Sequence, residues 1–178
     1  GDHNVMNALG ACTLADQMGI IFKHIKAGLE SFHGVDRRFQ FKGSINGVQL
    51  IDDYAHHPSE LEATLLAARS GWSDSRIIAV FQPHLYSRTR DFAQDFATAL
   101  EIADIAILTD IYPARELPIP GVTSELILKS GSNKIQFLSG IEDVHEFLSP
   151  KLKKDDLVIT MGAGDIWKLH GLFLEGEA

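Results

Sequence analysis

Two stretches of the sequence crowd together side chains that bind anions and transfer protons. Residues 52–58 read DDYAHHP, with two carboxylates, a phenol and two imidazoles, and residues 82–90 read QPHLYSRTR. Imidazoles gain and lose protons near neutral pH, and guanidinium groups bind carboxylates and phosphates through paired hydrogen bonds. The two stretches could therefore hold a carboxylate or a phosphate beside groups that move protons.

Each stretch also has a simpler interpretation. Residues 52–58 could be a solvated polar turn before a helix, because Pro58 suits the first turn of a helix. In the second stretch, Arg88 or Arg90 could be a surface arginine that pairs with Asp91 or Asp95. The crowding of so many polar and aromatic side chains after apolar strands favours a functional site over these alternatives.

Two further segments follow apolar runs and offer weaker signals. Residues 110–122, DIYPARELPIPGV, form a long loop with three prolines that carries Asp110, Tyr112, Arg115 and Glu116, and long loops in compact domains are often functional. The glycines of residues 162–167, GAGDIW, could let the backbone approach a ligand closely, and the start of the helix that follows favours anions. The chain has no GK[ST] triplet and no GxGxxG string, so it carries neither common phosphate-loop fingerprint.

Hydrophobic periodicity predicts the elements that position these segments. Phe39–Phe41 alternates, Asn46-Gly47 is a hairpin signal, and a strand resumes at residues 48–51. Strands and helices then alternate, which predicts an α/β fold with a mostly parallel sheet, helices on both faces and an N-terminal β-hairpin. Helices are expected at 4–18, 21–30, 59–70, 89–103, 123–130, 141–149 and 165–174, with Thr89 as a possible cap, and further strands at 76–81, 105–109, 135–138 and 157–161.

The net charge, the cysteine count and the lengths of the apolar runs argue against several classes of function. The 178 residues carry a formal net charge of −8, which disfavours a nucleic-acid-binding surface. The one cysteine, Cys12, cannot form an intrachain disulfide or a cysteine-type zinc site, and we expect it to be a buried thiol. No metal-binding motif is present, and no apolar run is long enough to cross a membrane. A cytoplasmic protein fits these features.

Several long strings, in this order, resemble the Mur ligase family almost from end to end. They are HNVMNAL, GVDRRF, DDYAHHPSE, FQPHLYSRTRDF, IYPARELPIPGV and MGAGDIW. The resemblance is to the branch that joins L-alanine to UDP-N-acetylmuramate in peptidoglycan precursor synthesis, at the expense of ATP. It implies that residues 1–35 are the helical tail of a central ATPase domain, and that residues 36–178 are the C-terminal domain.

The resemblance also implies a nucleotide-binding set. Its members are His3, Asn4 and Asn7 near the adenine, Arg38 at the ATP phosphates, and Asp53 at the ribose, with Asp52 as the second choice. The family's Mg²⁺ would be held mainly by the nucleotide and by the central domain, and no residue of this chain is expected to bind a metal directly.

A second set is implied at the amino-acid end of the site. His56, His84 and Arg88 are the expected catalytic residues, and Tyr54, His57 and Tyr86 are expected to contact substrate. Many family members have an arginine where this chain has Leu85, so Arg88 becomes the expected partner of the L-alanine carboxylate. The family's reaction forms an acyl phosphate that the amine attacks, which requires cations around the phosphoryl group and a proton acceptor near the amine.

Three alternatives remain open from the sequence. A muropeptide-recycling ligase of the same family would prefer a tripeptide to L-alanine. A nucleotide-binding module without chemistry would fit the parallel sheet and the GAGD turn, and a metal-dependent hydrolase could use the histidines. The leading expectation is a ligase domain that is inactive by itself.

Overall fold

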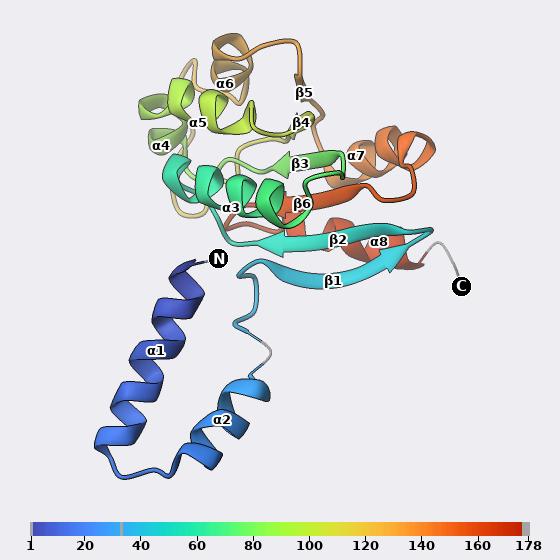
Figure 1. The fold of residues 1–178 in the computed structure, drawn as a ribbon. Coiled ribbons are helices and arrows are strands. Elements are labelled where there is room, and N and C mark those ends of the chain that lie inside the picture. Colours follow the sequence, from blue (N-terminus) through green and yellow to red (C-terminus); the bar gives the residue numbers. More distant parts are fainter. Residues whose placement is uncertain (1, 33, 176–178) are drawn as a thin grey trace. The chain divides into compact units, whose positions relative to one another are not determined.

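The computed structural model describes residues 2–32 and 34–175, and the chain divides into two compact units, Gly1–Asp36 and Arg37–Ala178. The first unit pairs helix α1 (Asp2–Gln17) with helix α2 (Phe22–Glu30) (Figure 1). Ile25 is the one buried side chain among the described residues of this unit. The prediction that Cys12 is a buried thiol is wrong, because its side chain is only partly buried in this pair of helices.

The second unit is built on a six-stranded sheet with the strand order β1-β2-β6-β3-β4-β5. The hairpin of β1 and β2 is antiparallel, and the other neighbours pair in parallel. Asn46 and Gly47 connect the hairpin with φ angles of 51° and 82°, the left-handed conformations that a two-residue turn requires. The strands are β1 (Gln40–Ile45), β2 (Val48–Asp53), β3 (Ile77–Phe81), β4 (Ile105–Leu108), β5 (Ile135–Phe137) and β6 (Leu157–Met161).

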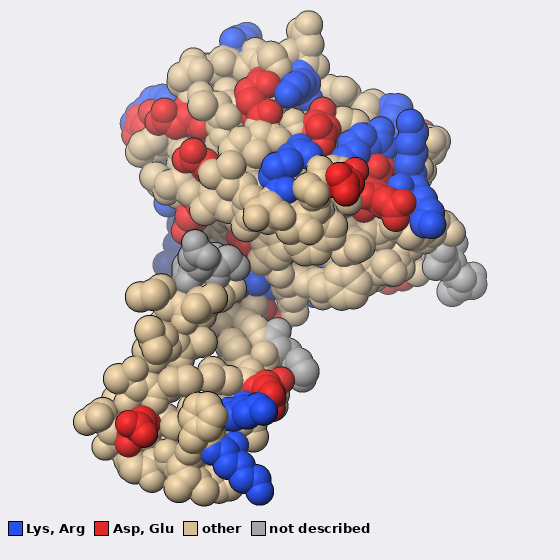
Figure 2. Space-filling model, in the orientation of Figure 1, with Lys and Arg blue, Asp and Glu red and all other residues tan. Residues whose placement is uncertain are grey.

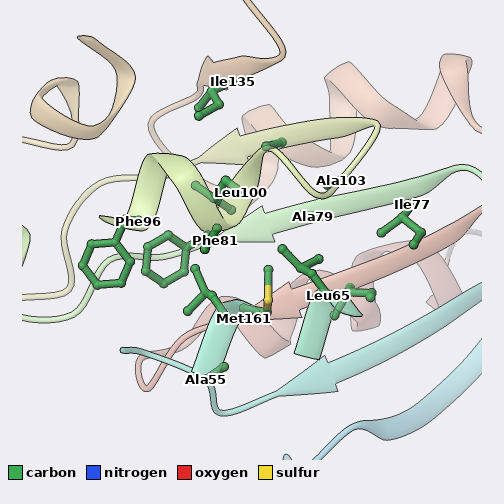
Figure 3. Close-up of a cluster of buried hydrophobic side chains, with 14 of the residues drawn as sticks. Ala55, Leu65, Ile77, Ala79, Phe81, Phe96, Leu100, Ala103, Ile135 and Met161 are labelled. Atoms are coloured by element: carbon green, nitrogen blue, oxygen red, sulfur yellow. The ribbon is translucent and has the colours of Figure 1, made fainter. Parts of the chain in front are cut away.

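Helices cover both faces of this sheet, which confirms the predicted α/β fold. On one face, α3 (Pro58–Gly71), α5 (Ala93–Leu100) and α6 (Glu125–Ser130) enclose a core that includes Leu65, Phe81 and Phe96 (Figure 3). On the other face, α7 (Ile141–Leu148) and α8 (Leu169–Glu175) pack against Val80 and Val158. Short 3-10 turns, Ser149–Lys151 and Ile166–Lys168, adjoin these two helices.

The predicted helix at 89–103 is wrong in its bounds. Helix α4 (Tyr86–Asp91) begins three residues earlier than predicted, and Phe92 interrupts the run with φ −121° and ψ 20° before α5 begins. Thr89 therefore lies inside α4 and is not a cap. Its hydroxyl donates to the Leu85 carbonyl, one turn back, at 2.9 Å.

Charged side chains do not form a single-sign surface on the visible face of the second unit. Figure 2 shows lysines and arginines intermixed with aspartates and glutamates over that face. In residues 2–32 and 34–175, no helix combines the length and the apolarity needed to cross a membrane.

A buried polar network connects the carboxyl ends of the neighbouring strands β2 and β6. The Asp52 carboxylate is fully buried and accepts hydrogen bonds from Arg37 Nε at 2.9 Å and Thr160 Oγ1 at 2.7 Å. Arg37 also donates to the carbonyls of Gly162 at 2.6 Å and Gly164 at 3.0 Å. The guanidinium of Arg37 therefore connects β2 to the GAG turn, residues 162–164, which follows β6.

His170 of α8 ends this network. Its Nε2 lies 2.7 Å from Thr160 Oγ1, the hydroxyl that also donates to Asp52. Burial lowers the pKa of His170 to about 4, against the opposing effect of the Asp52 carboxylate. The imidazole is therefore neutral at pH 7.

We expect Arg37→Met to lower the free energy of unfolding by about 3–5 kcal/mol, because it leaves the buried Asp52 carboxylate without its cation. Arg90→Met is the matched control: Arg90 pairs with Asp91 at 2.7 Å, but about half of each side chain is exposed. That loss should be much smaller, because solvent screens an exposed ion pair. Urea denaturation of both variants measures the difference, and equal small losses would contradict the role of Arg37.

We also expect His170 to make the fold sensitive to acid. The unfolded chain binds a proton at this residue near pH 6.5, whereas the folded chain does so only near pH 4, so acidification through that window favours unfolding. The loss from pH 7 to pH 5 should be about 2 kcal/mol. Denaturation at both pH values should show this loss reduced in His170→Gln but not in His24→Gln, which changes an exposed histidine of α2. The same loss in both variants would refute the assignment.

Candidate functional site

The DDYAHHP turn is held by its own carboxylates. Asp53 is 6% exposed, and its two carboxylate oxygens accept the backbone N–H groups of Ala55 at 2.8 Å and Phe39 at 2.7 Å. Burial raises the pKa of Asp53, although these two bonds and the charge of Arg38 oppose the rise. Asp53 thus fixes the start of the turn and the segment next to Arg38.

Glu60 of α3 fixes the other end of the same turn. Its carboxylate accepts the backbone N–H groups of His56 at 2.9 Å and His57 at 3.1 Å. Burial acts to raise the pKa of Glu60, but those two backbone bonds and the charges of His56 and Arg38 bring it below its usual value. Pro58 is the first helical residue, as predicted.

The two adjacent histidines of the turn have different neighbours. The His56 ring lies edge-on to Tyr54, with 5.2 Å between ring centroids, and edge-on to His84 at 5.7 Å. His57 Nδ1 lies 2.9 Å from Ser59 Oγ, and its ring contacts Phe92 at 5.0 Å. His56 therefore forms a cluster with Tyr54 and His84. His57 instead packs against Phe92, the residue between α4 and α5.

Arg88 joins the cluster from α4. Its Nη1 lies 3.4 Å from the His56 carbonyl oxygen and 3.5 Å from His84 Nδ1. Both contacts are long for hydrogen bonds, and Arg88 forms no ion pair with any residue in the described ranges. Its paired donors can therefore bind a carboxylate ligand.

Burial also sets the protonation of His84. It lowers the pKa of His84, and the nearby charges of Arg88 and His56 lower it further, while Glu116 acts in the opposite direction. The imidazole is consequently neutral at physiological pH and can accept a proton. The structure thus brings together, at the ends of β2 and β3, a neutral imidazole, a second imidazole and a guanidinium that has no carboxylate partner among the described residues.

The two adjacent arginines of the GVDRRF string differ in their surroundings. Arg37 is committed to the buried network, and its guanidinium also lies 5.0 Å from the Tyr54 ring centroid. Arg38 is exposed, with its guanidinium 5.8 Å from the same ring. Both carboxylates of the DD pair are buried, Asp52 at 0% and Asp53 at 6% exposure.

The remaining predicted residues lie outside this cluster or outside the description. Tyr86 begins α4 and is half-buried, and Asn4 and Asn7 are exposed on α1 of the first unit. The side chain of His3 lies outside the described side chains. Within the described ranges, no three histidine, cysteine, aspartate or glutamate side chains group closely enough to hold a metal ion.

Sequence reasoning did not select two residues that contact the cluster. Tyr112, on the loop after β4, stacks on His84 with 5.9 Å between centroids and 12° between planes. Glu116 of the same loop accepts a hydrogen bond from the Ser87 backbone N–H at 3.0 Å and another from the Ser87 hydroxyl. The tyrosine and the acid within a long proline-rich loop were the only sequence signal for these contacts.

Comparison with known proteins assigns the family. Residues 37–164 match the family described as Mur ligase, glutamate ligase domain. The UDP-N-acetylmuramate–L-alanine ligase of Geotalea daltonii is 48% identical over 170 residues, covering 93% of this chain and 37% of that protein.

Solved structures show the same similarity. The crystal structure of UDP-N-acetylmuramate–alanine ligase from Thermotoga maritima has a TM-score of 0.81 at 30% identity, covering 99% of this chain and 38% of that one. A murein peptide ligase from Psychrobacter arcticus has a TM-score of 0.69 at 27% identity, covering 98% and 37%. Because the family match covers residues 37–164, well over half of the chain, the chain belongs to the Mur ligase family, of which it contains the glutamate ligase domain.

Proposed function

We propose that this chain is the amino-acid-binding and ATP-closing part of an ATP-dependent ligase that joins L-alanine to UDP-N-acetylmuramate. The chain spans less than two-fifths of the length of the relatives it matches. The observation that carries the proposal is the meeting of His56, His84 and Arg88 beyond the ends of β2 and β3, the two strands that flank β6 in the sheet. The 48% identity to a relative named for this reaction supports the choice of substrates.

At the amino-acid end, Arg88 binds the L-alanine carboxylate. Its guanidinium has no carboxylate partner among the described residues, and a bidentate pair would fix the amino acid in one orientation. The amine must lose a proton before it attacks the acyl phosphate of UDP-N-acetylmuramate. His84, kept neutral by burial, or His56 beside it can accept that proton. Tyr54, whose ring lies edge-on to His56, borders the amino acid, and His57 and Tyr86 are the proposed substrate contacts outside the cluster.

At the nucleotide end, Arg38 and Asp53 are the contacts of the second unit with ATP. Arg38 is exposed and cationic, as a phosphate ligand must be. Asp53 accepts two backbone N–H groups and a hydrogen bond from the Thr64 side chain, which leaves about one of its four lone-pair sites for a ribose hydroxyl. His3, Asn4 and Asn7 of the first unit contribute at the adenine.

Mg²⁺ would be bound chiefly by the ATP phosphates and by the preceding part of the enzyme. Magnesium commonly uses substrate phosphates as ligands. ATP and a UDP-linked sugar are cytoplasmic metabolites, so we place the enzyme in the cytoplasm. Neither nucleic acid nor membrane has a part in this proposal.

The test replaces Arg88 in the full-length ligase. Arg88→Met should raise KM for L-alanine about 10- to 100-fold, because a hydrogen-bonded charge pair contributes about 1.5–3 kcal/mol. Arg90→Met is the control, since Arg90 lies two residues away on α4 but pairs with Asp91. Its KM should stay within about twofold of the parent enzyme. Phosphate release measured against L-alanine concentration gives both constants.

The same assay distinguishes the alternatives. A parent enzyme that uses a tripeptide in preference to L-alanine would be a muropeptide-recycling ligase. Nucleotide binding without amide formation would indicate a binding module. An unchanged KM in Arg88→Met would overturn the assignment of Arg88 to the carboxylate, whichever substrate is used.

A further inference from the structure

The turn that carries His84 has an unusual backbone. Leu85 has φ 72° and ψ 136°, a backbone conformation that residues other than glycine rarely adopt. The Leu85 N–H donates to the Tyr112 carbonyl at 3.0 Å, and the Tyr112 N–H donates to the Pro83 carbonyl at 2.8 Å. These two bonds form a short parallel bridge between His84 and Tyr112 that stabilises the turn beyond the end of β3.

The Tyr112 side chain lies between His84, which follows β3, and Gly164, which follows β6. On one side its ring lies nearly parallel to the His84 imidazole. On the other side lies Gly164, where a Cβ atom would stand 2.6 Å from Tyr112 Cγ and 2.2 Å from Gln82 Oε1. The absence of a side chain at residue 164 therefore makes room for the ring.

The loop that carries Tyr112 is anchored near the cluster. Glu116 accepts two hydrogen bonds from Ser87, on the first turn of α4, whose next residue is Arg88. Other charged groups near His84 are His56 and Arg88. Tyr112 is thus fixed by backbone bonds at its own position and by a side-chain anchor four residues later.

We propose that Tyr112 is a positioning residue of this site, which holds the His84 imidazole against His56 and Arg88 by stacking on it, with Gly164 providing the space for the ring. The meaning of this role for catalysis rests on the proposed function, but the contact itself does not. A stacked ring covers one face of the imidazole, so it contributes to the burial that keeps His84 neutral.

The experiment measures the His84 ring by NMR in the 178-residue chain, with ¹³C-labelled histidine, over a pH titration. In Tyr112→Leu we expect the His84 ring protons to move downfield, because the shielding aromatic face is lost, and the pKa of His84 to rise because its burial decreases. Tyr112→Phe keeps a ring and should preserve both values. Leu117→Ala, which changes an 85% exposed side chain of the same loop, should change neither.

A second pair of variants covers the case in which Tyr112→Leu does not fold. Gly164→Ala should displace the Tyr112 ring and shift the His84 signals in the same direction. Gly171→Ala on α8 is its control, because a Cβ there meets nothing closer than 3.9 Å. Unchanged His84 signals in folded Tyr112→Leu or in Gly164→Ala would overturn the proposal, as would equal shifts in the Leu and Phe variants.

An activity measurement separates this inference from the proposed function. In the full-length ligase, Tyr112→Leu should move the acid limb of the kcat profile to higher pH, and Tyr112→Phe should restore it. If the NMR signals shift while the pH profile stays constant, Tyr112 still positions His84, but His84 is not the proton acceptor of the reaction.

Discussion

Two adjacent carboxylates at the end of β2 must be buried, and each needs hydrogen-bond partners to be stable there. Successive strand residues face opposite sides of a sheet, so Asp52 and Asp53 organise different parts of the molecule. Asp52 binds Arg37 and Thr160 and so connects β2, β6 and the GAG turn. Asp53 binds the backbone at Phe39 and Ala55 and so fixes the turn that leads to the histidines.

The position of the exposed groups follows from these internal bonds. Because Arg37 points inward and Phe39 is held by Asp53, the residue between them, Arg38, is presented on the surface. Because Glu60 fixes the backbone of His56, that ring lies against His84. Side chains that would be mobile in an open loop are therefore held in one arrangement before any ligand binds, which reduces the entropy lost on binding.

Much of the fold was predictable because it depends on local patterns. Alternating strands and helices indicated a parallel sheet, and Asn46-Gly47 indicated the hairpin turn, which the structure confirms. The meeting of residues 52–58 with residues 82–90 followed from a general property of such sheets, in which ligands bind at the carboxyl ends of strands. Periodicity does not record the break at Phe92, since residues on both sides of it are helical.

Other features depend on contacts between distant residues and could not be read from the sequence. No local pattern distinguishes the inward Arg37 from the outward Arg38. Arg37 points inward because it donates hydrogen bonds to the carbonyls of residues 162 and 164, which are distant in the sequence. The stacking of Tyr112 on His84 depends on a loop path set by two backbone bonds. The partial burial of Cys12 depends on how few side chains cover α1, which the apolar residues near it in the sequence could not reveal.

We propose that the residues after β2 and β3 form one binding site for an amino-acid carboxylate and its amine. A crystal structure of the full-length ligase with L-alanine and a non-hydrolysable ATP analogue would show where the amino acid binds. We expect the alanine carboxylate to pair with Arg88 and its amine to lie within hydrogen-bond reach of His56 or His84. An alanine bound elsewhere, with Arg88 in contact only with protein, would contradict it.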